Sequence, residues 1–460
     1  MQASTFLTRL KKMSPAQALM SYYLASILVG AVLLATPPAS SGAPLSFLDA
    51  LFTATSAQCV TGLIVVDTGT RLSLFGQGVV LLLIQIGGLG IMTFSVYLFI
   101  YLRVGLSVRG RWLINETLLH TPISSWRELI RDIIAMTLII EALGAVALAV
   151  AFIPKLGFWP GLYSALFHSV SAFCNAGFSL FPDSLVGFRD NPLVNLTIIM
   201  LIILGGIGFL VIRELYQAGY AKSRDRKARV RLSLHSRIVL VTTAFLIIYG
   251  TIGIGWLEAG GSLAGMPAAE GFWTAFFQSV SARTAGFNTI DLNAFREQTL
   301  FLMIFLMFIG ASPGSAGGGV KTTSLALFFA ILYSRLKGSP HTSLFRRTIP
   351  DEAITKALAL VVLAMILIGS ALFGLLIVQH PDLAHEQPRE FLGYLFETFS
   401  AFGTVGLSIG ATGKLTTLGK VIIILLMFAG RVGLLTMAFA IAGRTRSHAP
   451  RYAEENIMIG

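Results

Sequence analysis

Long apolar runs alternate with short polar segments along the whole chain. Eight of these runs hold about 20 residues or more, the length that a helix needs to cross a hydrocarbon core about 30 Å thick. No segment between them is long enough for a soluble domain of ordinary size. The pattern predicts an all-α membrane protein with eight transmembrane helices, at about residues 18–36, 74–101, 130–153, 193–216, 238–258, 300–333, 353–379 and 418–442.

A short segment recurs four times, once between the two runs of each successive pair. Each copy has a bulky apolar pair, a polar residue, Ser-Ala, and a glycine five or six residues after the serine. The period is about 110 to 120 residues, which indicates an internal repeat. The copies are residues 51–62 (LFTATSAQCVTG), 166–177 (LFHSVSAFCNAG), 276–286 (FFQSVSARTAG) and 395–406 (LFETFSAFGTVG).

These repeats divide the chain into tandem units of span, pore loop and span. The predicted segments are a cytosolic N-terminus (1–13), repeats 1 to 4 (14–125, 126–237, 238–350 and 351–446) and a cytosolic C-terminal tail (447–460). Each short segment holds about a dozen residues, too few to cross a bilayer as a helix. Irregular backbone at membrane depth is tolerated only inside protein or along a watery cavity. Four re-entrant half-helices therefore predict one central pore.

Composition and charge agree with a membrane protein. Of the 460 residues, 55% are hydrophobic and 12% are charged, and the mean hydropathy is +0.78. A formal net charge of +12 is found in many nucleic-acid-binding proteins, but here the basic residues are concentrated in alternate polar segments. The positive-inside rule then places both termini in the cytoplasm and needs no nucleic acid. The basic residues are Arg9, Lys11, Lys12, Arg103, Arg109, Arg111, Lys222, Arg224, Arg226, Lys227, Arg229, Arg231, Arg237, Arg335, Lys337, Arg346, Arg347, Arg444, Arg446 and Arg451, and the intervening loops carry Asp67, Glu258, Asp291, Asp382 and Glu390.

The ends of the chain and its cysteines add little chemistry. The first run follows a basic stretch without a small-residue cleavage site, so we expect a retained span and not a signal peptide. The two cysteines are too few for a disulfide framework and are expected to be free thiols.

The residues that end each short segment form a candidate cation filter. Charge topology makes each short helix enter from outside with its negative carboxyl end toward the membrane centre, an arrangement that favours a cation. Backbone carbonyls after the helix can then replace the water of an ion. An isolated glycine there would be read as a turn former, but four in register favour a filter. The candidate residues are Cys59, Val60, Thr61, Gly62, Cys174, Asn175, Ala176, Gly177, Arg283, Thr284, Ala285, Gly286, Gly403, Thr404, Val405 and Gly406.

A candidate gate interrupts the sixth apolar run. The sequence GASPGSAGGGV at 310–320 puts one proline and five glycines inside a predicted span, where a continuous helix cannot persist. We expect two half-helices joined by a loop at 311–320 below the filter. A phosphate-binding loop is excluded because Val320 separates the last glycine from Lys321, whereas a packing kink between helices stays open. The candidate gate residues are Ser312, Pro313, Gly314, Ser315, Gly317, Gly318, Gly319, Lys321 and Arg431.

Two charged residues lie in mid-span. Arg431 is about ten residues from either end of the last run, where a charge costs at least ~2.5 kcal/mol. Its guanidinium could hold the carbonyls of the 311–320 loop or the Ser312 and Ser315 hydroxyls, or it could be a structural tie between repeats 3 and 4. Glu141 has no evident partner, and packing between repeats, dimer contact and an ion role all stay open.

One polar column runs through the four short segments. Thr53, His168, Gln278 and Glu397 hold equivalent positions, and we expect them to anchor the short helices by hydrogen bonds more than to touch the ion.

Several motifs together resemble a known family. SAQCVTGLIVVDTGT with its following GGLGIMT, and NAGF, TAGFNT, GTVGL and SPGSAGGGVKT, are similar to the membrane subunit of the Ktr potassium-uptake system, in the superfamily that includes Trk and HKT transporters. The resemblance covers nearly the whole chain. One departure is that the third loop has one residue fewer between Ser281 and Gly286 than its counterparts.

The resemblance implies a function and partners that the residues alone do not. It implies potassium uptake across a bacterial cell membrane, sodium-linked in some members, with no organic cofactor in this chain. It also implies a homodimer with one pore per subunit and a cytosolic ring of nucleotide-binding, RCK-type regulatory subunits. In the family the loop corresponding to 311–320 obstructs the pore and moves.

Two other classes of protein were weighed. A sodium-coupled secondary transporter of a small solute would be built from inverted halves. Here each repeat crosses the membrane an even number of times, so all four have one orientation. An intramembrane enzyme would need HExxH, GxSxG in a helical context or paired mid-span carboxylates, which the sequence lacks. The basic segment 222–237 is expected to meet lipid headgroups, with an acidic protein face as the alternative.

Overall fold

A computed structural model describes residues 14–104, 126–225, 231–379 and 388–442. The predicted terminal segments 1–13 and 447–460 lie outside the described residues. So do these charged residues: Arg9, Lys11, Lys12, Arg109, Arg111, Arg226, Lys227, Arg229, Asp382, Arg444, Arg446 and Arg451.

The helices follow the repeat order. Repeat 1 holds α2 (Pro15–Leu34), η1 (Pro37–Ala39), α3 (Phe47–Gln58), α4 (Thr68–Arg71) and α5 (Leu74–Val104). Repeat 2 holds α7 (Trp126–Leu156), α8 (Phe158–Phe173), η2 (Val186–Phe188), α9 (Pro192–Ile207) and α10 (Phe209–Arg224). Repeat 3 holds α11 (Leu234–Glu258), α12 (Ala268–Ser281), η3 (Leu292–Ala294), α13 (Glu297–Phe308) and α14 (Thr322–Leu336), and the antiparallel pair β1 (Ser343–Leu344) and β2 (Arg347–Thr348) follows. Repeat 4 holds α15 (Asp351–Gln379), α16 (Pro388–Gly403), η4 (Thr412–Lys414), α17 (Thr417–Val432) and α18 (Leu434–Ala442).

Several of these helices can span a membrane. In the described part of the chain five are long and apolar enough: α2, the Leu74–Phe94 part of α5, the Glu128–Leu156 part of α7, α11 and α15. The pair α9 and α10 passes the same test together but is bent by 105°. The all-α membrane architecture is therefore present, whereas a total of eight spans stays a prediction.

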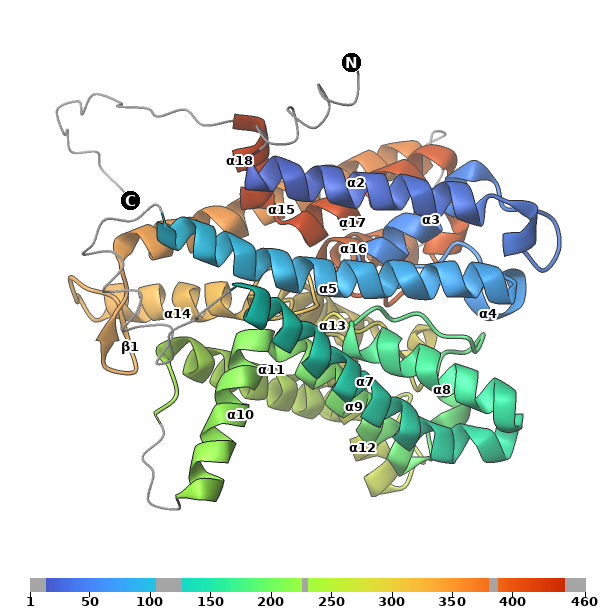
Figure 1. Cartoon of the computed structure of the whole chain (residues 1–460), viewed down its shortest axis with the longest axis horizontal. Helices are drawn as coiled ribbons and strands as arrows, with labels where there is room; N and C mark the ends of the chain where they lie inside the picture. Colours follow the sequence, from blue (N-terminus) through green and yellow to red (C-terminus); the bar gives the residue numbers. More distant parts are fainter. Residues whose placement is uncertain (1–13, 105–125, 226–230, 380–387, 443–460) are drawn as a thin grey trace.

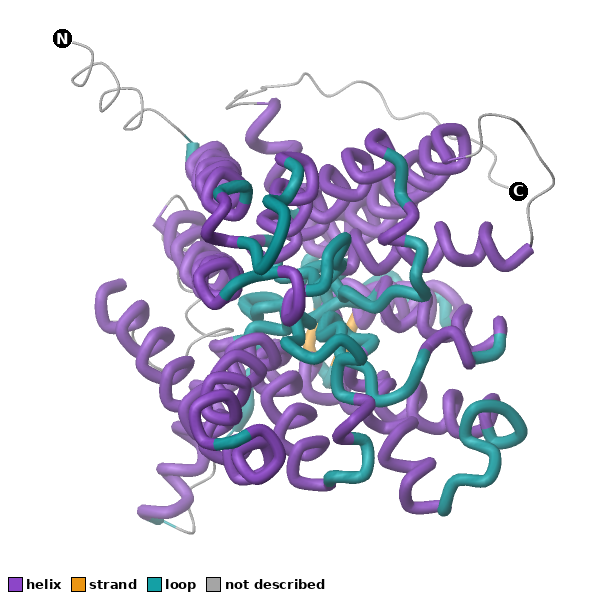
Figure 2. The backbone as a smooth tube through the Cα atoms, turned by 90° about the vertical axis from the view of Figure 1, so that its right-hand side faces the viewer, coloured by secondary structure: helices purple, strands orange, loops and turns teal. Residues whose placement is uncertain are grey.

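The long helices surround the short ones. In Figure 1 the long helices run side by side across the view, and Figure 2, which looks along them, shows loop segments gathered at the centre. The helices α3, α8, α12 and α16 that lead into these loops are largely buried, as α3 is from Phe52 to Gln58. The long helices expose apolar faces, for example Leu138, Leu143 and Val146 of α7. A continuous apolar exterior of this kind is suited to lipid.

Glycines let the second long helix of a repeat approach its short helix closely. A Cβ atom on Gly87, Gly205 or Gly430 would overlap the carbonyl oxygen of a residue near the end of the short helix in the same repeat. The carbonyls concerned belong to Gln58, Phe173 and Phe402, respectively. The glycines that recur in the second apolar runs are thus sites of close backbone approach.

Two predicted spans are not continuous. The run predicted at 193–216 was wrong as a single helix, because α9 ends at Ile207 and α10 continues at 105° after Gly208, whose φ is +91°. The run predicted at 418–442 is likewise divided at Gly433, whose φ is +86°. Glycine takes a positive φ without steric cost, so it can end a helix inside an apolar sequence. The interruption predicted in the sixth run is present, since residues 309–321 between α13 and α14 are not helical.

Candidate functional site

The backbone after each short helix takes the same shape in all four repeats. The residue two before each final glycine and the glycine itself have positive φ, a conformation that costs a non-glycine residue about 1–2 kcal/mol. The angles are +56° and +94° at Val60 and Gly62, +58° and +68° at Asn175 and Gly177, +69° and +78° at Thr284 and Gly286, and +50° and +88° at Thr404 and Gly406. Four loops strained in the same way form one structural feature and not four unrelated turns.

The serine of the repeated Ser-Ala pair holds this shape in place. In repeat 1 the Ser56 carbonyl accepts from the Thr61 amide at 2.8 Å, and the Ser56 hydroxyl accepts from the Gly62 amide at 3.1 Å. In repeat 4 Ser400 makes the equivalent bonds to Val405 and Gly406, at 2.8 and 3.1 Å. These bonds offset the cost of the positive φ angles.

The shorter third loop keeps the same final shape. Its helix α12 ends at Ser281 itself, whereas α3 and α8 continue two residues beyond their serines. The Ser281 carbonyl accepts from Ala285 at 3.0 Å and from Gly286 at 3.3 Å. The missing residue is therefore removed from the helix end, and Thr284–Gly286 matches the other three loops.

The four final glycines form a closed ring. A Cβ atom on Gly62 would lie 2.5 Å from the Ala176 oxygen and 3.1 Å from Gly177 Cα. One on Gly177 would lie 2.8 Å from the Ala285 oxygen and 2.9 Å from Gly286 Cα. The Gly286 position faces Val405 O and Gly406, and the Gly406 position faces Thr61 O and Gly62 in the same way. We call Gly62, Gly177, Gly286 and Gly406 the glycine ring; its order follows the order of the repeats.

The first predicted residue of each loop lies outside this ring. The side chains of Cys59, Cys174 and Arg283 are buried behind their loops, and a Cβ on Gly403 would lie 2.5 Å from Met307 O. Cys174 lies against Gln85 of α5 and Glu141 of α7. Three of the four predicted residues in each loop therefore belong to the ring region, and the fourth lies behind it, against the surrounding helices.

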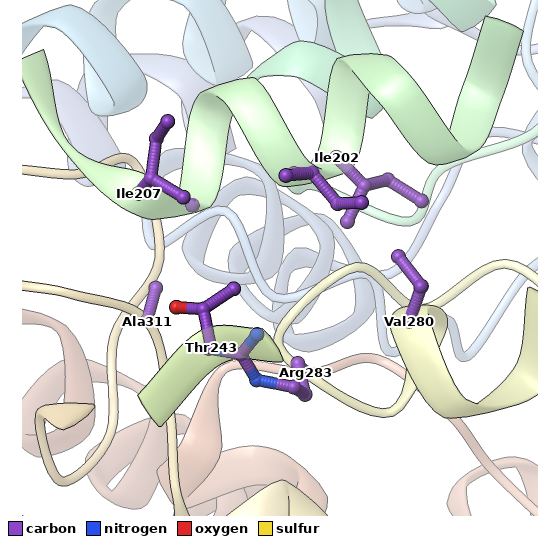
Figure 3. A pocket seen from close by; sticks show the side chains of 8 residues that line it. Ile202, Ile207, Thr243, Val280, Arg283 and Ala311 are labelled. Atoms are coloured by element: carbon purple, nitrogen blue, oxygen red, sulfur yellow. The ribbon is translucent and has the colours of Figure 1, made fainter. Parts of the chain in front are cut away.

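Arg283 lies against a small cavity beneath the third loop (Figure 3). The cavity of about 10 Å³ lies between Ile202 of α9, Thr243 of α11 and Ala311. Arg283 is only 7% exposed, and neither its Nε nor the Thr243 hydroxyl has a hydrogen-bond partner within the described residues. The volume is about that needed to hold one water molecule.

A wider cavity lies on one side of the glycine ring. This vestibule, of about 440 Å³, is lined by all four ring glycines and by Asp67, Asp183 and Asp291. Among the residues that the structure describes, no lysine or arginine lines it, so its field favours cations. Asp67 and Asp291 entered the sequence-based predictions only through the membrane topology, and Asp183 did not enter them. The missed signal is their spacing, since each aspartate follows its ring glycine by five or six residues.

Two residues of the polar column in the short helices hold the loops that leave the ring. His168 Nε2 lies 3.0 Å from the Ser179 hydroxyl, and the Glu397 carboxylate accepts from the Ser408 and Thr412 hydroxyls. The hydrogen-bonding role expected for these two residues is present. Thr53 instead bonds to Asp49 O within its own helix, and the Gln278 amide has no partner within the described ranges.

Segment 309–321 lies on the side of the ring opposite the vestibule. The vestibule is lined by the ring glycines and the residues after them, whereas this segment meets residues that precede them. The Gly318 amide donates to the Thr404 hydroxyl at 3.0 Å, and a Cβ on Gly317 would overlap Thr284. The amides of Ser312 and Ala316 donate to carbonyls of repeat 2, both at 3.0 Å. The segment therefore joins three repeats directly below the ring.

Arg431 bonds to this segment. Its Nη1 donates to the Ala316 carbonyl, its Nη2 donates to Gly87 O at 2.7 Å, and its Nε donates to the Tyr23 hydroxyl at 3.3 Å. The two serines proposed as partners bond elsewhere: the Ser312 hydroxyl lies 2.9 Å from that of Thr322, and the Ser315 hydroxyl donates to Ser312 O. Arg431 thus links the segment to repeat 1 as well as to its own repeat.

Glu141 links the first two repeats behind the second loop. Its Oε2 accepts from Gln85 Nε2 of α5 at 3.1 Å, and its Oε1 lies 3.8 Å from Cys174 Sγ. The Glu141 carbonyl accepts from the Ser169 hydroxyl at 2.6 Å. Of the open readings, packing between repeats is the one for which the structure supplies partners.

Comparisons with known proteins agree on one family of cation transport proteins. A family model described as TrkH, cation transport protein, matches residues 5–447. The chain is 40% identical over 451 residues to Ktr system potassium uptake protein B of Bacillus subtilis (strain 168), covering 98% of this chain and 97% of the relative. It is 41% identical over 440 residues to Ktr system potassium uptake protein B of Vibrio alginolyticus, covering 95% and 93%.

Two further similarities extend this result. The chain is 38% identical over 455 residues to the potassium/sodium uptake protein NtpJ of Enterococcus hirae, covering 98% of both chains. Its fold is similar to the crystal structure of the potassium transporter TrkH from Vibrio parahaemolyticus, with a TM-score of 0.73 and 19% identity over 93% of this chain and 85% of that one.

Proposed function

The chain belongs to the TrkH family of cation transport proteins, and from that premise we propose how it takes up potassium. It is a multi-pass membrane transporter and not an enzyme. Potassium ions enter the vestibule, lose water at the glycine ring and leave past segment 309–321. The observation that carries this proposal is the closed ring, because four backbone loops that meet at one axis offer peptide oxygens to one ion.

The short helices support the ring electrostatically. Each of α3, α8, α12 and α16 ends just before the three residues that finish with its ring glycine. Four negative helix ends therefore point at one axis. Backbone at this depth needs either protein around it or an ion pathway, and the buried short helices with the vestibule supply both. The predicted filter residues Val60–Gly62 and their counterparts in the other three repeats form this site, whereas Cys59, Cys174, Arg283 and Gly403 support it from behind.

The vestibule concentrates cations before they reach the ring. Replacing Asp67, Asp183 and Asp291 together by asparagine is expected to raise the apparent KM for potassium several-fold, up to about tenfold, at low ionic strength. Asparagine keeps the acceptor that caps Thr70 and Asn293, so the loops retain their shape. Uptake in vesicles at low and high salt measures the effect, which should shrink as salt screens the field.

Asp190→Asn is the matched control for this triple variant. It also removes an acidic side chain, but one that is 80% exposed and does not line the vestibule, so its KM should stay at the wild-type value. If the triple variant keeps the wild-type KM at low salt, the vestibule charges do not concentrate the ion.

Segment 309–321 acts as the gate. Its glycines allow close approach below the ring, and its bonds to Gly205, Gly206, Thr404 and Arg431 hold it across the ion path. The bonds between neutral groups contribute about 1 kcal/mol each and the one from Arg431 about 1.5–3 kcal/mol, so a modest change elsewhere can release the segment. Lys321 Nζ donates to Gly317 O at 2.7 Å and adds a positive charge that opposes cation passage while the segment stays in place.

Glu141 positions the second loop. Glu141→Ala is expected to destabilise the purified protein by about 1–3 kcal/mol and to lower potassium selectivity over sodium, because Gln85 and Cys174 lose their partner. Glu141→Gln keeps an acceptor for Gln85 and should stay close to wild type. Thermal unfolding and ion competition measure both variants. Equal damage from alanine and glutamine would show that the carboxylate charge, and not its hydrogen bonds, is what the site needs.

The names of the relatives support a proposal about partners. The homologues named Ktr system proteins suggest a subunit of a larger assembly, and we infer a homodimer over a cytosolic RCK-type ring with both termini in the cytoplasm. The NtpJ relative, named for potassium and sodium uptake, suggests that sodium also interacts with the pathway.

Growth rescue tests the proposed function. A bacterium that lacks potassium uptake should grow at limiting potassium when it expresses this chain with its cognate cytosolic partner. Gly62→Ser should not support growth although the protein is made, because the ring has no room for a side chain. Absence of rescue by well-expressed wild type with its partner would overturn the potassium assignment.

A further inference from the structure

The helix α10 leaves the bundle direction. After Gly208 the chain turns by 105°, and Figure 1 shows α10 running across the direction that the spanning helices follow. A helix that is roughly perpendicular to the spanning helices lies along the membrane plane. It lies toward the opposite end of the bundle from α4, whose Thr68 lines the vestibule (Figure 1).

The surface of α10 has the composition of a membrane-interface helix. Only Phe209 and Val211 are fully buried. Both lie next to the turn at Gly208, which we call the elbow. Along the rest, Tyr216 is 72% exposed and Tyr220 is 61% exposed, one helical turn apart on the same face. Lys222 and Arg224 follow in the last turn. Aromatic side chains beside basic ones are typical of helices that meet the headgroups of anionic lipids.

The first turns of α10 are fixed to the protein. The Glu214 carboxylate accepts from the Ser233 amide and hydroxyl at 2.5 and 2.8 Å and from the Ser236 hydroxyl. These bonds satisfy the first turn of α11. Arg213 Nη2 lies 4.0 Å from Asp132 of α7. The helix is thus held near its start, whereas Tyr216, Tyr220, Lys222 and Arg224 toward its end are exposed.

The elbow exchanges backbone bonds with segment 309–321. Because α9 ends at Ile207, its last carbonyls lack partners within the helix, and the same holds for the first amide of α10. The carbonyls of Gly205 and Gly206 accept from Ala316 and Ser312, and the Phe209 amide donates to Gly314 O at 3.1 Å. A Cβ on Gly208 would lie 2.6 Å from Pro313 O. Movement of α10 about the elbow must therefore disturb this segment.

We propose that the exposed side of α10 binds anionic phospholipid headgroups and that this contact stabilises segment 309–321 through the elbow, so that anionic lipid lowers ion flux. The coupling rests on the proposed function, in which that segment gates the pore. A lipid surface is favoured over an acidic protein face because the two tyrosines suit the boundary between headgroups and acyl chains, and because α10 lies in the membrane plane.

Purified protein in vesicles tests the proposal. Rubidium flux is compared between vesicles of phosphatidylcholine alone and vesicles in which a third of the lipid is phosphatidylglycerol. An environment-sensitive dye on Ser223→Cys reports the contact of α10 with lipid independently of flux; both native cysteines are buried. We expect a blue shift of the dye and about fivefold lower flux in the anionic vesicles.

Variants separate lipid contact from coupling. Lys222→Gln with Arg224→Gln should lose both the blue shift and the lipid dependence of flux. Gly208→Ala should keep the blue shift but lose the dependence, because the elbow is disturbed. The matched control, Arg346→Gln with Arg347→Gln, removes the same charge from the β1–β2 turn and should respond as wild type.

Several outcomes would overturn the proposal. These are equal dye emission and flux in both vesicles, an unchanged response of the Lys222 and Arg224 variant, or an equal loss of response in the Arg346 and Arg347 control. If Lys222→Gln with Arg224→Gln kept the lipid response but no longer bound a cytosolic partner protein, α10 would be a protein-docking surface instead. Absence of rubidium flux in every vesicle would overturn the transport function, while the dye would still decide whether α10 binds anionic lipid.

Discussion

Gly286→Ser is expected to lower potassium uptake at least about tenfold and to weaken selectivity for potassium over sodium. The backbone at Gly286 has φ +78°, where a side chain costs about 1–2 kcal/mol. A Cβ there would also lie 3.0 Å from Gly177 Cα and 3.3 Å from Gly406 Cα. Both neighbours are backbone of the ring, so the side chain can be accommodated only by moving carbonyls of the proposed filter. Since 1.4 kcal/mol corresponds to a factor of ten, the backbone cost alone gives about a five- to 30-fold loss, and the close contacts add to it.

The same repeat supplies the control for this experiment. Gly271→Ser makes the same change near the start of α12, where a Cβ would meet nothing within 4 Å. Uptake by the two variants in the growth assay and in vesicles, with expression measured for each, separates a ring effect from a general effect of serine. If Gly286→Ser transports as well as Gly271→Ser, the ring is not the filter.

The repeat and its short helices could be read from the sequence because they depend on local patterns. Run lengths predicted the long helices, and the spacing of Ser56 from Gly62 predicted the place of the loop. Even the shorter third loop was visible as one missing residue. Its structural consequence could not be predicted. The helix α12 ends at Ser281, earlier than its counterparts, and hydrogen bonding decides where a helix ends.

The helix break at Gly208 could not be predicted from hydrophobicity. Phe209 to Ile212 are apolar, so the pattern of a span continues through the turn. What ends α9 is the positive φ of Gly208 together with the amides of Ser312 and Ala316, which lie more than 100 residues away along the chain. Contacts of such separation have no signature in a local window, and the same reason hid the partners of Glu141.

The central position of Arg431 was predicted in part. Its depth in a span marked it as functional, and loop carbonyls were among the partners considered. The sequence could not decide between those carbonyls and the serine hydroxyls, because both lie in the same short segment. Nor could it indicate the bond to Gly87 of repeat 1, which makes Arg431 a link between the first and last repeats as well as to segment 309–321.

Arg431→Ala is expected to raise basal flux about tenfold or more in purified protein. The substitution removes the Nη1 bond to Ala316 O and the Nη2 bond to Gly87 O. Hydrogen bonds from a charged group contribute about 1.5–3 kcal/mol each, so loss of the one to segment 309–321 shifts the gate equilibrium by about tenfold to 150-fold. Rubidium flux into vesicles, without any regulatory partner, measures the change directly.

Tyr23→Phe distinguishes release of the gate from a general loss of packing. It removes the hydroxyl that accepts from Arg431 Nε and donates to Gly87 O at 2.9 Å, but it leaves the bond between Arg431 and Ala316 intact. Its flux should therefore stay at the wild-type level, even though the variant loses two buried hydrogen bonds and some stability. If folded Arg431→Ala shows wild-type flux, Arg431 is only a tie between repeats. If Tyr23→Phe leaks as much as Arg431→Ala, the contact with segment 309–321 is not what holds the gate closed.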